Sequence, residues 1–319
     1  MKALVVGGLG FIGHWVVRKL EDRGIECAII DCKETYETQN QLWMMRVFES
    51  RERQIQSPIH DIDVLDGAKV KEFLIDYNPT HIIYLAGPPN QSAVDTDINR
   101  ASRVMIEGLN NFLRLRTTQR FVYISSSMVY GNFVDPVSET VTTAPINSYG
   151  LLKLAAENLV RSVGIPYTII RPSSVYGPRD ADDRVIARWL EASKNGFPLS
   201  VNGEDEQLDF TWVGDLAWGI VESMLSENAI NETFNLTRGG AVRLKVVAEL
   251  IKKITKSDSE IIVRDLSKDH PSRTTLIIDH AESAFGYNPP TDVETGIKLY
   301  WLWLRQYEES LYDSLQQSR

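Results

Sequence analysis

The sequence predicts an α/β protein in which a doubly wound parallel sheet is followed by a smaller C-terminal α/β domain. Short, continuously apolar runs alternate with longer helical patterns through the first half of the chain, as in parallel strands covered by helices on both faces. A glycine-rich turn follows the first of these runs and leads into the first helical pattern. The length of 319 residues also exceeds what one compact core usually contains, which indicates a second domain.

The predicted strands and helices alternate in chain order. The strands are Ala3–Val6, Ile25–Ile30, His81–Ala86, Phe121–Ser125 and Tyr167–Arg171. The helices between them, where apolar residues recur every three or four positions, are Phe11–Arg23, Val70–Tyr77, Val104–Arg116 and Tyr149–Val163. Repeated βα units of this length predict right-handed crossovers within one parallel sheet.

Glycines and prolines become frequent after Arg171, and the segments between them become shorter. We therefore predict that residues 1–171 form the first domain and that 172–319 mainly form the second, with 209–228 returning to the first. Further predicted elements are the helices Phe210–Leu225 and Lys245–Thr255 and the strand Glu232–Leu236. From Gly296 onward, apolar residues at helical spacing predict an amphipathic helix that packs on the body. These residues are Ile297, Tyr300, Trp301, Leu304, Tyr307 and Leu311.

Composition places the chain among folded globular proteins, with 43% apolar and 24% charged residues. Its 43 acidic and 34 basic residues leave a net charge of −9, so nucleic acid is not expected as a partner, because phosphate binding needs a basic face. No apolar stretch is long enough to span a bilayer, and the N-terminus enters a strand at once without a signal-peptide cleavage site. We therefore expect no membrane association and a cytoplasmic location.

The cysteines also indicate a reducing compartment, and the histidines do not indicate a metal site. Cys27 and Cys32 are the only cysteines, which suits a reducing compartment and predicts no disulfide framework. The five histidines, at positions 14, 60, 81, 270 and 280, lack the paired spacing typical of metal ligands. No metal site is predicted.

Gly7, Gly10 and Gly13 form a G-x-x-G-x-x-G turn between the first strand and the first helix. In a Rossmann-type site the first glycine permits the tight turn, the second lets a pyrophosphate approach the backbone, and the third lets the helix pack on the strand. The helix begins at Phe11 and Ile12, where backbone N–H groups are available to an anion. The sequence therefore predicts that the first domain binds a dinucleotide.

Asp31 closes the second predicted strand, eighteen residues after Gly13. A carboxylate there can accept hydrogen bonds from both hydroxyls of the adenosine ribose, and it would repel a 2′-phosphate. NAD is therefore expected in preference to NADP, although the nearby Lys33 weakens the distinction.

Tyr149 and Lys153 are four residues apart at the head of a predicted helix, so their side chains share one face. A phenol has a reference pKa of about 10, too high for a base at neutral pH. The Lys153 ammonium and the positive nicotinamide ring of NAD would stabilise the phenolate and lower that pKa. Tyr149 is therefore the predicted acid/base, and one of Ser125, Ser126 and Ser127, at the end of the preceding strand, is expected to bond the same substrate oxygen.

Several further segments accompany the glycine turn and the Tyr149/Lys153 pair. They are Asp61-Ile62, Leu85-Ala86-Gly87, Ser125–Gly131, Arg171–Pro178 and Asp209–Leu216. With these segments the chain resembles, over almost its whole length, the extended short-chain dehydrogenases/reductases. Within that family it is similar to the NAD-dependent sugar-nucleotide epimerase/dehydratase group of the UDP-glucose/UDP-galactose 4-epimerase type.

The resemblance implies roles for particular residues. By the family's pattern Ser126 is the catalytic serine, acting with Tyr149 and Lys153, and residues beyond Arg171 would hold a nucleotide sugar. Besides the glycine turn, the implied cofactor-binding residues are Asp31, Asp61, Ile62, Leu85, Ala86, Gly87, Tyr149 and Lys153. The family also implies a homodimer formed through a four-helix bundle.

Three positions depart from the family's pattern. Leu208 replaces its usual arginine, Ser174 replaces an asparagine that often contacts the substrate diphosphate, and Met105 replaces a helix asparagine. Other groups would then hold the diphosphate, with Arg273 as the first candidate and Arg184 as the second. The implied substrate-binding residues are Ser127, Ser174, Arg184 and Arg273.

The type of reaction is predicted from two further positions. The family's dehydratases carry an Asp-Glu pair directly after the catalytic hydroxyl residue, and its decarboxylases carry a glutamate two positions before the tyrosine of the Tyr-Gly pair. Ser127 and Met128 occupy these positions here, so elimination lacks its carboxyl catalyst. The resemblance then favours epimerisation of a nucleotide sugar at C4 through a 4-keto intermediate. The alternatives are an NAD(H)-dependent nucleotide-sugar dehydrogenase or 4-keto reductase, and a non-catalytic dinucleotide-binding regulator.

Overall fold

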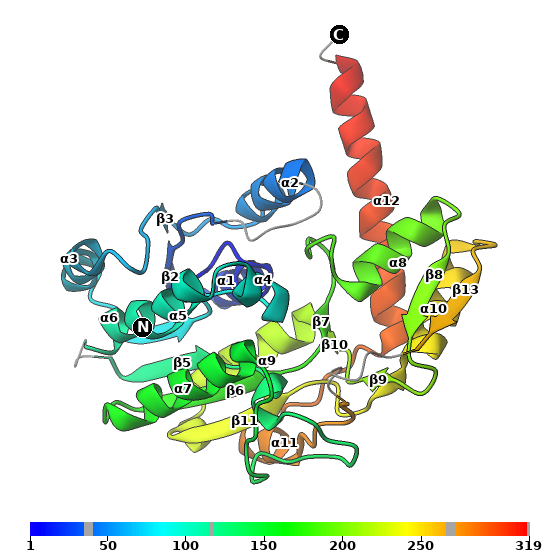
Figure 1. Ribbon diagram of the computed structural model, residues 1–319. Coiled ribbons are helices and arrows are strands. Elements are labelled where there is room, and N and C mark those ends of the chain that lie inside the picture. Colours follow the sequence, from blue (N-terminus) through cyan, green and yellow to red (C-terminus); the bar gives the residue numbers. More distant parts are fainter. Residues whose placement is uncertain (35–40, 115–117, 266–271, 318–319) are drawn as a thin grey trace.

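A single parallel sheet organises the computed structural model, which describes residues 1–34, 41–114, 118–265 and 272–317 (Figure 1). Its seven strands are hydrogen-bonded in the order β11-β6-β5-β4-β1-β2-β3, and every pairing is parallel. The strands are β1 (Lys2–Val6), β2 (Glu26–Ile30), β3 (Ile59–His60), β4 (His81–Tyr84), β5 (Arg120–Ile124), β6 (Tyr167–Pro172) and β11 (Glu232–Leu236). The predicted doubly wound α/β sheet is confirmed.

Helices cover both faces of this sheet, so its strands are apolar without alternation. On one face lie α1 (Phe11–Asp22), α9 (Val213–Leu225) and α11 (Asp279–Phe285). On the other lie α3 (Gly67–Tyr77), α6 (Leu109–Leu113) and α7 (Ser148–Ser162). Alternate residues of β1 show the division, since Val5 packs on the first face and Leu4 on the second.

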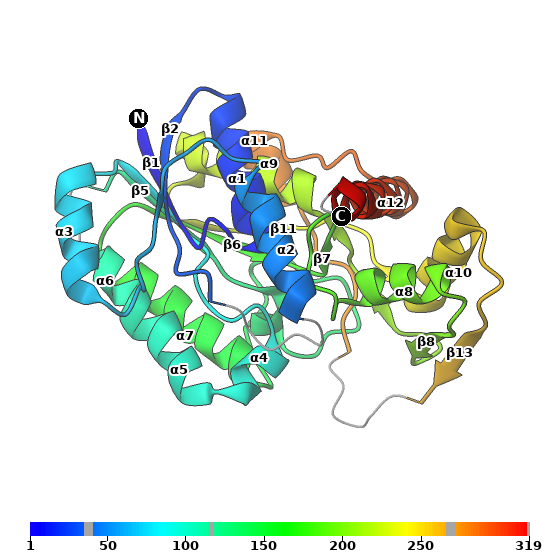
Figure 2. The same ribbon diagram turned by 90° about the horizontal axis from the view of Figure 1, so that it is seen from above.

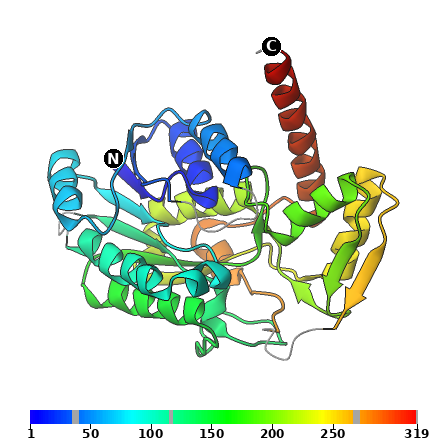
Figure 3. The same cartoon turned by 45° about the horizontal axis from the view of Figure 1, so that its top comes forward.

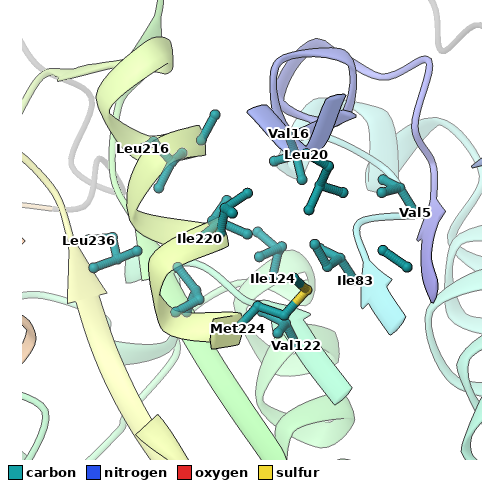
Figure 4. Close-up of a cluster of buried hydrophobic side chains, with 14 of the residues drawn as sticks. Val5, Val16, Leu20, Ile83, Val122, Ile124, Leu216, Ile220, Met224 and Leu236 are labelled. Carbon is teal, nitrogen blue, oxygen red and sulfur yellow. The ribbon is translucent and has the colours of Figure 1, made fainter. Parts of the chain in front are cut away.

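The first face carries a large apolar cluster, drawn in Figure 4. Leu216 and Ile220 of α9 and Leu20 of α1 meet there above the strands, and all three side chains are fully buried. Helix α9 is therefore part of the large sheet's core, although it comes late in the chain. The other helical segments of this half are α2 (Gln41–Glu52), α4 (Gln91–Thr96), α5 (Ile98–Ser102), the 3₁₀ turn η2 (Ser127–Tyr130) and the 3₁₀ turn η3 (Glu227–Ala229).

The helix predicted at Val104–Arg116 is not a continuous α-helix. A π-helical turn, η1 (Arg103–Gly108), precedes α6, and the predicted end at Arg116 falls outside the described residues. The Tyr84 hydroxyl donates to the Val104 carbonyl at 3.4 Å, which gives that carbonyl a partner outside the helix. At Gly108 an added Cβ would lie 2.6 Å from a methyl carbon of Val64, so the backbone approaches its neighbour closely there.

A smaller group of elements packs beside the sheet (Figure 2). Its apolar core is shared by α8 (Val185–Lys194), α10 (Leu244–Thr255), α12 (Val293–Gln317) and the parallel pair β8 (Leu199–Asn202) and β13 (Ile261–Arg264). Two further pairs are β7 (Val175–Tyr176) with β10 (Thr211–Trp212), and β9 (Gln207–Leu208) with β12 (Val242–Arg243).

Helix α12 begins in this smaller core, where Ile297, Tyr300 and Leu304 are buried. Its outer turns project away from the rest of the protein (Figures 1 and 3). The Leu311 side chain lies outside the described residues. Within the described ranges no helix, α12 included, is both long enough and apolar enough to cross a membrane.

Candidate active site

The turn between β1 and α1 has the close contacts that require glycine. Gly7 has a φ of +81°, and a Cβ added there would lie 2.9 Å from the backbone nitrogen of Ala86. A Cβ at Gly13 would lie 2.2 Å from the Gly7 carbonyl oxygen. Gly10 precedes α1 without a capping side chain, so the N–H groups of the first helical turn, from Phe11 and Ile12 onward, are left for a ligand.

A cleft opens beside this turn, at the carboxyl ends of β1, β2 and β4. Its lining residues are Gly7, Gly10, Ile30, Asp31, Cys32, Glu34, Phe48, Ile62, Asp63, Val64, Leu85, Ala86, Gly87 and Val104. Most of the predicted cofactor residues are therefore brought together. Asp61 is not among the lining residues, and its side chain is exposed, whereas Asp63 contributes to the lining.

Asp31 is held by the turn that it faces. Its carboxylate accepts hydrogen bonds from the backbone N–H groups of Leu9 (2.9 Å) and Lys33 (2.8 Å). Burial raises the pKa of Asp31, and these hydrogen bonds lower it. The Lys33 ammonium points elsewhere and pairs with Glu52 at 3.1 Å. The lining also contains the carboxylates of Glu34 and Asp63, and both of these are paired with Arg100. The carboxylate of Asp31 is therefore the group that disfavours a 2′-phosphate in the cleft.

The predicted catalytic group lies at the junction of β5 and α7. Asn147 caps α7 by accepting from the Gly150 N–H, and Gln91 accepts from the Tyr149 N–H, both at 2.8 Å. Tyr149 is 8% exposed, and burial raises the pKa of its phenol. The charge of Arg184 and a hydrogen bond with Ser126 lower that pKa. The structure therefore brings Ser126, Tyr149 and Arg184 together.

Lys153 lies beside Tyr149, one turn further along α7. Its ammonium donates to the Ile124 carbonyl at 2.8 Å and lies 5.7 Å from the centre of the Tyr149 ring. It thus lies over the face of the Tyr149 ring. That Lys153 and the positive nicotinamide ring of NAD together lower the pKa of Tyr149 stays a prediction. Burial lowers the pKa of Lys153 itself to about 8, against a smaller opposing effect of Glu157.

Glu157, which the sequence analysis did not identify, anchors this region. It is fully buried and accepts from the guanidinium of Arg171 at 2.9 and 2.7 Å, from Arg161 at 3.0 Å and from the Ser125 hydroxyl at 2.5 Å. A buried carboxylate needs this many partners to remain charged. Glu157 follows Lys153 by one helical turn, and that spacing was the available sequence signal.

The four predicted substrate residues have different environments. Ser127 is only 1% exposed, and Ser174 lies after β6 with a φ of +41°. Arg184 is half-buried and donates to the Pro89 carbonyl at 3.2 Å. Arg273 is half-buried too, with one guanidinium nitrogen 3.3 Å from the Met128 sulfur and a buried Nε that has no hydrogen-bond partner among the described residues. Of the four, Arg273 has the clearest unused bonding capacity.

Asp180, in the segment between β7 and α8, was also missed by the sequence analysis. It is 2% exposed, and one of its carboxylate oxygens has no hydrogen-bond partner in the described structure. Burial raises the pKa of Asp180 to about 7, although Arg184 and Arg51 act to lower it. Asp180 is therefore largely protonated below neutral pH.

This raised pKa predicts a pH-dependent stability. Between about pH 4 and pH 7 the unfolded chain releases the Asp180 proton more readily than the folded protein, so stability contributed by this group falls as the pH rises. We expect Asp180→Asn to raise the free energy of unfolding at pH 8 by roughly 2–4 kcal/mol, and to have almost no effect at pH 4. Urea unfolding at both pH values measures the difference. An equal effect of Asp180→Asn on the free energy of unfolding at the two pH values would show that the pKa of Asp180 is not raised in the folded protein.

No group of three or more histidine, cysteine, aspartate or glutamate side chains that could hold a metal ion occurs in the parts of the chain that the structure describes. Both Cys27 and Cys32 are free thiols. The site is therefore described by its glycine turn, carboxylates, hydroxyls and cations.

These features define a class, the enzymes that use a bound dinucleotide. A sequence model described as the NAD dependent epimerase/dehydratase family matches residues 3–237. The chain belongs to this family of enzymes, and NAD is the family's cofactor. The close turn at Gly7, the uncapped start of α1 and the carboxylate of Asp31 fit that cofactor.

Similar proteins include two that carry epimerase names. A protein of Bacillus subtilis described as an uncharacterized UDP-glucose epimerase is 30% identical over 317 residues, covering 93% of this chain and 96% of its own. A putative UDP-glucose 4-epimerase of Methanocaldococcus jannaschii is 28% identical, covering 95% and 98%. The UDP-glucose 4-epimerase structure of Thermotoga maritima superimposes with a TM-score of 0.84 at 24% identity, covering 96% and 99%, and so shares the fold. Decarboxylases and dTDP-glucose 4,6-dehydratases are also among the relatives.

Proposed function

We propose that the protein epimerises a nucleotide sugar at C4 with NAD, through a 4-keto intermediate. The observation that carries this proposal is the side chain at position 128. Met128 packs against the small apolar cluster that contains Tyr149 and touches Arg273. By the family's pattern, a thioether thus occupies the place where the decarboxylases carry a carboxyl group. Ser127 replaces the first acid of the dehydratases and is buried. Neither position offers a carboxyl group to catalyse elimination or decarboxylation.

The proposed proton transfers use the residues around Tyr149. Tyr149 takes the proton of the C4 hydroxyl while Ser126 holds the same oxygen. Burial raises the pKa of the phenol, whereas the charge of Arg184 and the Ser126 hydrogen bond lower it, and the positive nicotinamide ring of bound NAD would favour the phenolate further. When bound, NAD supplies the acceptor and the donor of the C4 hydride. The 4-keto sugar then turns over in the site, and Tyr149 returns its proton to the oxygen after hydride is delivered to the other face.

Lys153 has a positioning and electrostatic role in this proposal. Its ammonium is fixed beneath the Tyr149 ring by the Ile124 carbonyl. Since its pKa is about 8, it is mainly cationic at neutral pH and loses its charge as the pH rises through that value. The Ser125–Glu157–Arg171 contacts hold α7 against β5 and β6 and so keep Lys153 in place.

We expect Arg273 to bind the substrate diphosphate. Its buried Nε has no hydrogen-bond partner among the described residues, and its guanidinium lies beside Met128. Arg273→Ala should weaken nucleotide-sugar binding by ~1.5–3 kcal/mol, the scale of a charge-assisted hydrogen bond, and leave NAD affinity unchanged. Isothermal titration with UDP-glucose and with UDP measures the loss. Arg243, which is exposed on β12, provides the matched control as Arg243→Ala. Unaltered binding by Arg273→Ala would exclude this role.

The reaction is tested with a panel of UDP-, dTDP-, GDP- and CDP-sugars and with the sugar products resolved by NMR. An epimerase interconverts two C4 epimers without net NADH. A dehydrogenase or 4-keto reductase changes NADH in step with the substrate consumed, and a regulator binds dinucleotide without turnover. The panel therefore separates the proposal from both alternatives and identifies the base and the sugar.

Assembly, location and domain roles belong to the same proposal. We propose a homodimer through α7 and its neighbouring helices, because Leu151 on α7 and Ile98 on α5 are 55% and 45% exposed. Sedimentation of the wild type and of Leu151→Glu tests this.

We place the protein in the cytoplasm, which fits its free thiols. Residues 1–171 with 209–228 would bind NAD, and most of 172–319 would bind the sugar nucleotide.

A further inference from the structure

Arg51, at the end of α2, has an unusual environment for a cation. It is 3% exposed and forms no ion pair with a described residue. Its guanidinium instead donates to two backbone carbonyls: Nη1 to Leu9 at 3.1 Å, and Nε and Nη2 to Arg179 at 3.1 and 2.6 Å. Leu9 lies inside the glycine turn, and Arg179 lies in the segment 177–184 that precedes α8. One buried side chain thus joins the two loops.

Further contacts and charges from both loops surround Arg51. The N–H of Leu9 donates to Asp31 and its carbonyl accepts from Arg51, so both backbone polar groups of this turn residue are held. Asp31 and Asp180, one on each side, both act electrostatically to keep Arg51 protonated, against burial, which lowers its pKa to about 10. Asp31 contributes from the cofactor side, and Asp180 contributes from the 177–184 segment once the pH exceeds its own pKa of about 7.

The backbone conformation of Arg179 is one that neighbouring residues must stabilise. Its φ of +68° is in the left-handed region, where a residue with a side chain is disfavoured. The two hydrogen bonds from Arg51 to its carbonyl are joined by one from the Arg179 Nε to the Ser50 hydroxyl at 2.9 Å. The Arg179 guanidinium also lies 5.5 Å from the Trp303 ring of α12, and Trp303 packs on Trp43 of α2. Helix α2 therefore fixes the conformation of the segment.

We propose that Arg51 is a positioning residue that couples the glycine turn to the 177–184 segment, so that binding of NAD orders the segment that carries Asp180 and Arg184. The part of the inference that concerns substrate rests on the proposed function, since Arg184 is assigned there to the sugar-nucleotide site. The coupling itself requires only that NAD contacts the glycine turn. Arg51 is one turn along α2 from Phe48, which lines the cleft, so the same helix touches the cofactor site directly.

Hydrogen exchange measures this coupling without turnover. In the wild type, removal of NAD is expected to speed amide exchange about tenfold at residues 177–184 as well as at 7–13, about the factor that one hydrogen bond is worth. In Arg51→Gln the 177–184 amides should exchange fast even with NAD bound, and removal of NAD should then change exchange only at 7–13. Amide exchange within α10 that is as slow as in the wild type would show that the variant retains its fold. Arg53→Gln, which removes an exposed arginine two residues away, should behave like the wild type.

Two results would overturn the inference: exchange at 177–184 that does not respond to NAD in the wild type, or a full response in Arg51→Gln. If Arg51→Gln does not fold, Arg51→Lys decides, because an ammonium cannot reproduce the three hydrogen bonds of the planar guanidinium. In Arg51→Lys, removal of NAD should change amide exchange at 177–184 less than it does in the wild type. A response equal to that of the wild type would count against the proposal. A failure here leaves the epimerase proposal standing, because no outcome depends on sugar chemistry.

Discussion

Replacement of Tyr149 by phenylalanine should lower turnover at least ~100-fold, the low end of what general acid/base catalysis contributes. The phenol is the group that takes and returns the C4 hydroxyl proton in the proposed reaction. The phenol is hydrogen-bonded to Ser126 and lies within the electrostatic influence of Arg184, and the ring, which belongs to a small apolar cluster, is retained in the variant. Folding and NAD binding should therefore remain close to those of the wild type.

The comparison for this variant is Tyr167→Phe. Tyr167 begins β6, at the amino end of the strand, whereas the site lies at the carboxyl ends. Initial rates measured at saturating nucleotide sugar, with thermal unfolding recorded for both variants, separate loss of chemistry from loss of structure. Near wild-type turnover in Tyr149→Phe would remove Tyr149 from its assigned role.

Substitution of Gly13 by alanine is expected to disrupt the dinucleotide turn itself. The new Cβ would lie 2.2 Å from the Gly7 carbonyl oxygen and 2.9 Å from the Gly8 Cα, and backbone atoms cannot move aside as a flexible side chain does. Overpacking of this kind costs about 1–3 kcal/mol. Since the strain falls on the turn that faces NAD, affinity for NAD should fall roughly 5- to 150-fold.

NAD titration of the purified variant, followed by tryptophan fluorescence, measures this loss. Gly240→Ala is the matched control, because a Cβ at Gly240 meets nothing within 4 Å. Equal NAD affinity in the wild type and in Gly13→Ala would show that the turn does not face the cofactor.

The sheet and the cofactor turn could be predicted because their signals are local. A strand that is covered on both faces is a continuous apolar run, as in Ala3–Val6, and the turn depends on glycines whose spacing is fixed by backbone contacts. The same holds for Asp31, which follows a buried strand. These predictions needed no knowledge of distant parts of the chain.

Other parts of the site depend on contacts between residues far apart in sequence. Arg51 is a polar residue on a helix without a clear apolar stripe, and its importance comes from Leu9 and Arg179, 42 and 128 residues away. Asp180 has a raised pKa because the fold buries it. The Ile124 carbonyl that holds the Lys153 ammonium over the Tyr149 ring is 29 residues away from Lys153 in the sequence.

The position of Met128 and Ser127 leads to the central claim, that the same hydride leaves C4 and returns to it. The most direct test is the fate of deuterium placed at C4 of the nucleotide sugar that the substrate panel identifies. An epimerase retains the label at C4, reaches one equilibrium ratio from either epimer, and accumulates no NADH. Formation of a 4-keto-6-deoxy sugar, or release of NADH in step with substrate consumed, would contradict the account.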